Sequence, residues 1–333
     1  MTAPVAGISV VVCAYTLDRW GDLEASVESV IGLPEAPEVV LVIDHNPALL
    51  ERSRTRWPDR VVVANEFTQG LSGARNTGVK IASGEIIAFL DDDATADRSW
   101  LTFLLQPFSD PAVAGVGGRA VPVWPDSVAA GTTPGMYPAE LLWIVGCSHD
   151  GLPTSTSDVR NVIGCSMAFR REAILSVGAF NPDTGRVGTI PLGCEETEMC
   201  IRIRQADASA RIVLEPRAVV RHHVSEPRVT WGYLRRRSFY EGVSKAALSN
   251  QLGRGDSLSS EASYLTTVLP KAVLRELGRT GRGGAGRALA IVTTVAGTVL
   301  GYAVGSLRRA RLSTLDVAAQ REALDGVLSG GAS

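Results

Sequence analysis

The stretch IIAFLDDDAT, residues 86–95, joins a run of strand-forming apolar residues directly to three adjacent carboxylates. The apolar part, EIIAFL (85–90), is continuous enough for a strand that is buried on both faces of a sheet. Asp91, Asp92 and Asp93 follow at its carboxyl end, and like charges this close disfavour full ionisation unless a cation lies between them. The stretch therefore predicts a buried strand that brings acidic side chains to a cation.

The segments before this stretch also alternate apolar strands with helices. Strands are expected at 8–15, 38–44 and 61–65, and helices from about residue 20 and from Ser72, as an N-cap, to Gly84. This alternation indicates an α/β fold with a mostly parallel sheet that is covered by helices on both faces. Ligands of such sheets bind beyond the carboxyl ends of the strands. At that edge we expect Tyr15, Asp44, Asn65 and the three aspartates.

The rest of the chain predicts a continuation of the sheet and then a change of character. The expected elements are an irregular excursion rich in Pro, Gly, Ser and Thr (121–160), a strand (161–170), a helix (171–178), a loop leading into a helix (193–205) and two short closing strands (210–216 and 218–224). We therefore expect one domain over residues 1–227 and a basic helical extension over residues 228–333.

The net charge and the cysteine content indicate which kind of partner and which cellular compartment to expect. The 333 residues carry a formal net charge of −2, which gives no global reason to expect nucleic acid as a partner. The five cysteines are odd in number and show no CxxC spacing, which is typical of reduced thiols and not of a disulfide framework or a zinc site. The first residues, MTAPVAGISVVVCAY, lack the basic and long apolar regions of a signal peptide. We expect the protein to act on the cytoplasmic side.

The C-terminal extension combines basic and apolar segments. A strongly basic helix is expected over 228–245, and a Gly/Arg-rich linker (278–287) precedes 20 uncharged residues, 288–307. A helix of that length can cross a bilayer core. The flanking basic residues are Arg287, Arg308, Arg309 and Arg311. Because cations flank both ends, the positive-inside rule does not orient the segment.

Two interpretations of residues 288–307 stay open. In the first, the segment is a membrane-associated or membrane-spanning helix that brings the protein to a lipid surface. Gly297, Gly301 and Gly305, however, form a small-residue stripe suited to close helix packing, so the segment also fits a helix packed on the first domain or in a homodimer.

The aspartate triplet itself has three interpretations. It fits a solvated acidic turn after a strand. DDDAT also fits the DxDx(T/V) nucleophile pattern of haloacid-dehalogenase-type phosphatases, although that motif belongs on an early strand and no GDxxxD-like acidic pair follows here. The third interpretation is a divalent cation held against a nucleotide diphosphate, because carboxylate and phosphate oxygens together suit Mg²⁺ or Mn²⁺.

Five segments, in order and at suitable spacing, resemble family 2 of the inverting glycosyltransferases. They are ISVVVCAYTLDR, VVLVIDHNP, QGLSGARNTGVKIASGEIIAFLDDDA, GCSMAFRREAI and GCEETEMCIRIRQ, and they cover about residues 7–225. The resemblance implies a GT-A fold, which is Rossmann-like, and a metal-dependent transfer of a sugar from a nucleotide donor. The implied cofactor is Mn²⁺ or Mg²⁺.

The resemblance also implies a nucleotide-sugar site along the sheet edge. Ala14 and Tyr15 match the first-strand tip that holds the base and ribose, and Asp44 matches the acid that reads the uracil edge. A carboxylate accepts a hydrogen bond from N3 of uracil but not from N3 of cytosine, so a UDP-sugar is the expected donor. The other residues implied for this site are Arg75, Asn76, Asp91 and Asp92.

A second group of residues is implied for the metal and for catalysis. Asp93 and Asp91 would hold the metal, and the late histidine found in several such transferases points to His223 as a further ligand. Glu195 and Glu196 occupy a loop that usually carries Glu-Asp in the family, and Glu196 falls at the position of the base that deprotonates the acceptor hydroxyl. Alternatively, these glutamates only favour a helix N-terminus through its dipole.

Two side chains are expected on the acceptor side, each with a structural alternative. Met167 matches a strand that walls the acceptor pocket, or it is a core methionine, and Trp143 stacks on a sugar or lipid, or it anchors its loop. The resulting expectation is an inverting transferase that acts on a cell-envelope glycan or a lipid-linked acceptor. The alternative from another class is a non-catalytic membrane scaffold that retains the fold, and the intact acids at both sites argue against it.

Overall fold

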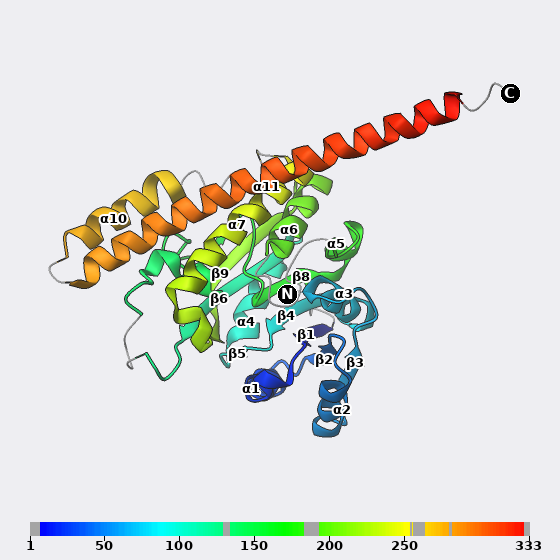
Figure 1. Ribbon diagram of the computed structural model, residues 1–333. Coiled ribbons are helices and arrows are strands. Elements are labelled where there is room, and N and C mark those ends of the chain that lie inside the picture. The colour runs from blue at the N-terminus through cyan, green and yellow to red at the C-terminus, as the bar shows by residue number, and fades with distance from the viewer. Residues whose placement is uncertain are drawn as a thin grey trace.

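A nine-stranded mixed sheet forms the centre of the molecule (Figure 1). The computed structural model describes residues 7–128, 134–182, 193–253, 255, 264–279 and 282–329, without the side chains of residue 282 and of residues 308–329. The strand order is β3-β2-β1-β4-β8-β6-β9-β5, and β7 pairs with β9. The strands are β1 (Ile8–Ala14), β2 (Glu38–Ile43), β3 (Val61–Ala64), β4 (Ile86–Asp91), β5 (Ala94–Ala96), β6 (Val113–Val123), β7 (Ser157–Asp158), β8 (Ser166–Arg170) and β9 (Arg211–His223).

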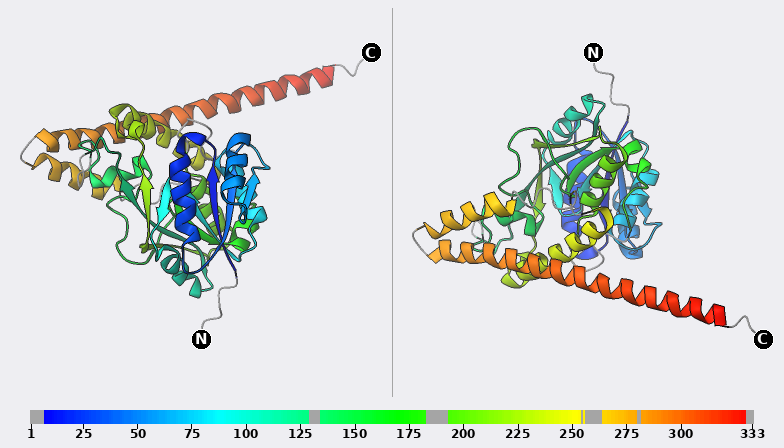
Figure 2. Two further views of the ribbon diagram at one scale, coloured as in Figure 1. Left: turned by 90° about the horizontal axis from the view of Figure 1, so that it is seen from below. Right: turned by 90° about the horizontal axis from the view of Figure 1, so that it is seen from above.

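Helices cover the sheet on both faces, and a group of C-terminal helices lies beside it (Figure 2). The short 3₁₀ segments are η1 (Leu17–Arg19), η2 (Gln106–Ser109), η3 (Ala139–Val145) and η4 (Glu226–Val229), and η5 (Tyr264–Val268) is a π-helical turn. The α-helices are α1 (Trp20–Ile31), α2 (Pro47–Arg56), α3 (Leu71–Ile81), α4 (Trp100–Leu105), α5 (Arg171–Ser176), α6 (Glu195–Ala206), α7 (Trp231–Leu252), α10 (Leu269–Leu277) and α11 (Arg282–Ser329).

The alternation of side chains along the central strands builds two separate cores. Val10 and Val12 of β1 point to one face, where they pack with α1, α2 and α4. Val11 points to the other face, where α3, α5 and α6 contribute side chains. Because successive residues of a strand face opposite sides, a continuously apolar strand is the pattern expected for a sheet covered on both faces.

The N-terminal half of the sheet is parallel, as predicted. β1 pairs in parallel with β2 and β4, and β2 pairs in parallel with β3. β8 then pairs antiparallel with both β4 and β6, so the complete sheet is mixed. The carboxyl ends of β1 to β4 meet at one edge, which is where the sequence placed its polar side chains.

Several expected elements differ from the observed ones. Residues 211–223 form one strand, β9, and not two short ones, because β9 pairs along β6 with two register shifts that absorb the irregularity. Strand β6 was not expected, and its Gly115 and Gly117 lie against Phe169 and Val162, where a Cβ would clash. The expected excursion therefore begins later, and residues 129–133 of it lie outside the described part of the chain. The predicted N-cap of α3 is also wrong, since Ser72 is buried inside the helix and Gly70 precedes it.

The helices after residue 230 form a third core with the η3 segment. Leu234 of α7, Leu269 of α10 and Ile291 of α11 are buried there beside Leu141 and Val145 of η3. α11 is a long rod along one side of the molecule, and its C-terminal turns project beyond the rest of the chain (Figures 1 and 2). The expected basic flank at residues 308–311 falls among the side chains that are not described.

The glycine stripe of α11 packs on α7 of the same chain, which corrects the expectation of a homodimer contact. A Cβ on Gly301 would lie 1.9 Å from the Phe239 carbonyl oxygen, and a Cβ on Gly305 would lie 2.9 Å from Ala246 Cβ. A Cβ on Gly242 of α7 would likewise lie 2.0 Å from the Thr298 carbonyl oxygen of α11. These small residues let the two backbones meet, so the stripe is already covered and does not offer a surface to a second subunit.

Candidate active site

Asp93 lies at the centre of a group of positively charged side chains. Its Oδ2 accepts from Arg19 Nη1 at 2.8 Å and from Arg228 Nη2 at 3.4 Å, and its Oδ1 is 3.2 Å from His222 Nε2. Burial by itself would raise the pKa of Asp93, but the charge and hydrogen bond of His222, with Arg228 and Arg19, hold that pKa well below its usual range. Asp93 is thus an anion at neutral pH.

The pKa values of His222 and Asp92, which lie beside Asp93, are both raised, for different reasons. Burial lowers the pKa of His222, but the Asp93 carboxylate outweighs it and raises that pKa to about 10. Asp92 contacts Arg19 Nη2 at 3.0 Å. Its own pKa is raised to about 8, first because it is buried and then because Asp93 and Asp91 add negative charge. The pKa values of the adjacent Asp92 and Asp93 therefore shift in opposite directions, so the two carboxyl groups need not both be charged.

Two carboxylates and one imidazole are arranged so that they could hold a metal ion. Asp91, Asp93 and His222 each offer one ligand atom, and these atoms lie within 4.8 Å of one another. Carboxylate oxygens with a single imidazole suit Mn²⁺ well and Mg²⁺ less well, because Mg²⁺ prefers an all-oxygen shell. The donor set therefore fits the implied cofactor.

The histidine in this group is His222, not the expected His223. His223 Nδ1 lies 2.6 Å from Asp22 Oδ1, and its side chain is about half exposed. In strand β9 the two rings point to opposite faces, and only the buried His222 faces Asp93. The histidine expected to lie at the metal site is therefore His222 and not His223.

A buried arginine connects the aspartates with the second acidic site. Arg75 Nη2 donates to Asp91 Oδ1 at 3.3 Å and to the Gly164 carbonyl at 3.1 Å, and its Nη1 donates to Glu195 Oε1 at 3.2 Å. Arg75 is only 2% exposed. A guanidinium buried to this degree holds two carboxylates from distant segments in a fixed relation.

Glu195 and Glu196 begin helix α6, directly after Cys194, which has a left-handed backbone. Glu195 is buried against Arg75. Withdrawal from water, and then the Glu195 charge, raise the pKa of the partly buried Glu196 to about 8, which Arg75 only partly offsets. A carboxylate with a pKa near the working pH is suited to accept a proton. The helix-dipole alternative is compatible with this position, so it does not exclude the role of a base.

Asp44 is fixed at the carboxyl end of β2. Its Oδ1 accepts from Asn65 Nδ2 at 2.7 Å and is 2.8 Å from His45 Nδ1, while its Oδ2 accepts from the Gly70 amide at 2.9 Å. Asn65 was also expected at this edge and serves as an anchor for Asp44. The carboxylate is thereby held in one orientation beside the start of α3.

The other residues expected at the donor site differ from one another in exposure and in their contacts. Ala14 is buried at the end of β1, and Tyr15 is 43% exposed with the Arg19 guanidinium 5.0 Å from the centre of its ring. Asn76, in contrast, forms two hydrogen bonds with the main chain of Phe180, from its Nδ2 at 2.8 Å and to its Oδ1 at 2.9 Å. These bonds give Asn76 a structural part, bracing the chain after α5.

The two acceptor-side residues also lie in different surroundings. Met167 of β8 is fully buried in the core beneath α3, α5 and α6, which agrees with its alternative as a core methionine. Trp143 belongs to η3 and is partly buried, with the Arg237 guanidinium of α7 5.7 Å from its ring. Trp143 therefore packs against the C-terminal helices, which agrees with its alternative as an anchor.

Sequence reasoning missed Arg19 and Arg228 as members of the site. Arg19 follows β1 in the segment TLDR, and Arg228 lies in η4, 135 residues after Asp93. Because ligands bind beyond the carboxyl ends of parallel strands, the position of Arg19 just after β1 could have indicated that it belongs to the site. Arg228 was counted only among the basic residues of the extension, and nothing local to it indicates a buried contact.

The sheet, the acidic cluster at its carboxyl edge and the acidic pair that Arg75 ties to it agree with the glycosyltransferase class of GT-A fold that the sequence resembles. The domain described as glycosyl transferase family 2 matches residues 9–178. The chain belongs to this family and is a glycosyltransferase, which decides against the phosphatase and scaffold alternatives.

Known relatives support this assignment. The chain is 33% identical over 246 residues to the glucosyl-dolichyl phosphate glucuronosyltransferase of Haloferax volcanii, covering 72% of this chain and 77% of that protein. A mannosyltransferase of Pyrobaculum calidifontis, solved with GDP-Man and Mn²⁺, superposes with a TM-score of 0.54 at 18% identity over 90% of this chain and 86% of the other. GalNAc-T7, solved with UDP, GalNAc and Mn²⁺, superposes with a TM-score of 0.51 at 18% identity over 79% and 58%. These structures share the fold.

Proposed function

We propose that the protein is a metal-dependent, inverting glycosyltransferase that moves a sugar from a UDP-linked donor to a lipid-linked or cell-envelope glycan acceptor. Residues 1–227 form its catalytic domain, and the extension associates it with the cytoplasmic face of a membrane. The observation that carries the proposal is that Arg75 ties the aspartate cluster to Glu195, directly beside Glu196. An inverting displacement needs a base on the side opposite to the departing diphosphate, and these two acidic sites supply both sides.

On the donor side, Asp91, Asp93 and His222 would hold Mn²⁺ or Mg²⁺. The metal, when bound, neutralises negative charge on the diphosphate. Arg19 and Arg228 lie beside Asp93, where they can face the same phosphates. The Mn²⁺ in both solved neighbours supports this choice of cofactor.

The base of the nucleotide is proposed from Asp44. An ionised carboxylate only accepts hydrogen bonds, so it favours uracil and thymine, which carry a hydrogen on N3, over cytosine. Guanine also carries a hydrogen on N1, and the two solved neighbours bind UDP and GDP-Man respectively. UDP and GDP must therefore be compared directly.

On the acceptor side, Glu196 would remove the proton of the attacking hydroxyl. The name of the Haloferax relative describes transfer to a glucosyl-dolichyl phosphate, which supports a lipid-linked acceptor for this chain. If the acceptor is instead an anionic lipid phosphate, the nucleophile needs no base, and Glu196 is dispensable.

A thermal-shift panel tests the proposal. UDP, GDP, CDP and dTDP are added with and without Mn²⁺ to the wild type, to Asp93→Ala and to the control Asp110→Ala, an exposed aspartate paired with Arg211. We expect UDP to raise the Tm of the wild type and of the control only with Mn²⁺, and to leave Asp93→Ala unchanged. A shift that needs no metal, or that survives in Asp93→Ala, would contradict the proposed site.

A further inference from the structure

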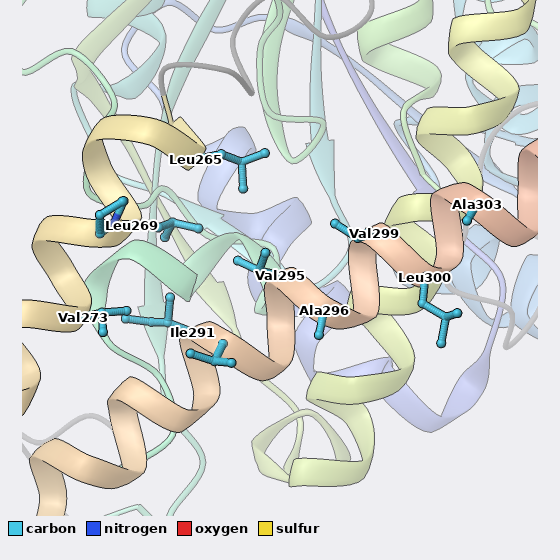
Figure 3. A pocket seen from close by; sticks show the side chains of 11 residues that line it. Leu265, Leu269, Val273, Ile291, Val295, Ala296, Val299, Leu300 and Ala303 are labelled. Atoms are coloured by element: carbon cyan, nitrogen blue, oxygen red, sulfur yellow. The ribbon is translucent and has the colours of Figure 1, made fainter.

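An open apolar groove of about 660 Å³ runs between α10 and α11 (Figure 3). Leu265, Leu269 and Val273 line one side, and Ile291 and Val295 face them from α11. The surface continues along α11, where Val292 is 55% and Leu300 is 59% exposed. An exposed apolar surface of this extent on one side of a protein indicates a site that contacts a membrane or another protein.

The opposite side of α11 is fixed to α7. The glycines described above bring the two helices into contact, and α7 carries the buried ion pairs of Glu241 with Arg237 at 2.7 Å and with Lys245 at 3.1 Å. The segment Gly283–Leu307 is long and apolar enough to cross a membrane. If it did so while packed on α7, these charges would enter the hydrocarbon, which is costly. A helix that lies flat leaves them on the aqueous side.

The charges around the groove suit an anionic lipid surface. Between residues 264 and 307 the sequence contains five cations and a single acid, Glu276. Lys271 and Arg275 are exposed on α10, and Arg279 is exposed just after its C-terminal end. Glu276 is buried and paired with Arg275 and Arg279, so it presents no negative charge outward.

We infer that α10 and α11 form a docking surface that lies flat on an anionic lipid bilayer, with α11 in the plane of the interface and not across the membrane. This inference rests on the proposed function and specifies its membrane association. It combines an exposed apolar face, an opposite glycine-rich face fixed to α7 and a cationic border, so that α11 can lie in the interface with the body of the protein in water.

The same surface is connected to the candidate active site through η3. Arg275 of α10 binds Glu140 with both guanidinium nitrogens, at 2.7 and 3.1 Å. At the other end of η3, the Val145 carbonyl accepts from Arg228, which contacts Asp93. A membrane that contacts α10 is therefore close in structure to the donor site, as a lipid-linked acceptor requires.

Flotation of the full chain with phosphatidylcholine vesicles, with and without phosphatidylglycerol, tests this inference. We expect binding to vesicles that contain phosphatidylglycerol, weakening at high salt, and release by an alkaline carbonate wash. Val292→Glu and Leu300→Glu should each weaken partitioning roughly tenfold, because each removes an apolar side chain from the interface and adds a negative charge. The control Leu175→Glu changes an equally exposed leucine on α5 and should bind like the wild type.

Three outcomes would overturn the inference. Resistance to the carbonate wash would mean that α11 spans the membrane. An equal loss of vesicle binding in Leu175→Glu would mean that the groove is not the docking surface. If the protein does not bind vesicles but forms a dimer that Val292→Glu dissociates, a second copy of the chain covers the groove. The UDP and Mn²⁺ thermal shift is measured on the same preparations. A retained shift without vesicle binding rejects the docking surface and the proposed membrane association, but not the proposed donor site and transfer reaction.

Discussion

At the scale of single residues, Glu196 gives the sharpest test of mechanism. Its pKa of about 8, against the usual 4.5, leaves it mostly protonated at neutral pH. The charged groups that face it are Glu195, Glu241 and Arg75. If Glu196 is the base, the active form of the enzyme is the one in which Glu196 is ionised. The rate should therefore rise with pH and level off above pH about 8.

Glu196→Gln should therefore lower kcat by about 10²–10⁴-fold with little change in the KM for donor, and it should abolish the rise with pH. Steady-state kinetics over a pH series provide the measurement. Glu172→Gln, an exposed glutamate on α5, is the control and should follow the wild-type profile. Near-wild-type activity of Glu196→Gln would mean that the acceptor is already anionic, as a lipid phosphate is, and needs no base.

Arg75 is the residue on which the geometry of the site depends. Arg75→Met would leave Asp91 and the buried Glu195 without their shared cation, and breaking a buried pair in this way costs about 3–5 kcal/mol. Equilibrium denaturation in urea measures the loss. Arg211→Met is the matched control, because Arg211 also joins two carboxylates, Asp110 and Asp158, but on the exposed surface.

The control should lose no more than about 1 kcal/mol, since exposed ion pairs contribute little. Similar losses in the two variants would mean that burial does not set the importance of Arg75.

At the scale of elements, the contact of α7 with α11 decides what the apolar helix does. Gly301→Ala places a methyl group 1.9 Å from the Phe239 carbonyl oxygen, so the helices must separate, at a cost of about 1–3 kcal/mol. Gly286→Ala in the same helix meets nothing within 4 Å and should instead stabilise the protein by about 0.4–1 kcal/mol. Thermal unfolding of both variants checks the pair.

If α11 were independent of α7, the two alanine variants would behave alike. Both would then gain a little stability from helix propensity alone.

At the scale of the whole molecule, the candidate site joins three distant parts of the chain. Arg19 follows β1, Asp93 follows β4, and His222 and Arg228 come from the end of β9 and the next turn. A nucleotide and metal bound at 100 times its Kd should add about 2.7 kcal/mol to the free energy of unfolding.

Hydrogen exchange should then slow together at these three segments when UDP and Mn²⁺ are added. The helix α5, which carries no residue of the candidate site, is an internal reference and should change little. Protection confined to the segment around Asp93 would show that Arg19 and Arg228 do not share the ligand.

Much of this architecture could be predicted from sequence because it depends on local patterns. Apolar runs of strand length alternating with amphipathic segments predicted the parallel half of the sheet and the edge at which Asp44 and the aspartates lie. The family could be assigned because its motifs are continuous segments. β6 was missed since its glycines have little strand propensity and are held by the contacts of Gly115 and Gly117 with neighbouring side chains.

The sequence by itself determined the class of protein, the strand ends that carry acids and the place of Glu195 and Glu196 at the entry to a helix. Only the tertiary structure decided between His222 and His223, because neighbouring residues of a strand face opposite sides and the register of β9 against β5, with His222 opposite Ala94, selects which ring faces Asp93. It also gathered Arg19 and Arg228 around one carboxylate and directed the glycines of α11 onto α7. Such contacts join residues far apart in the chain, and the local pattern of residues carries no record of them.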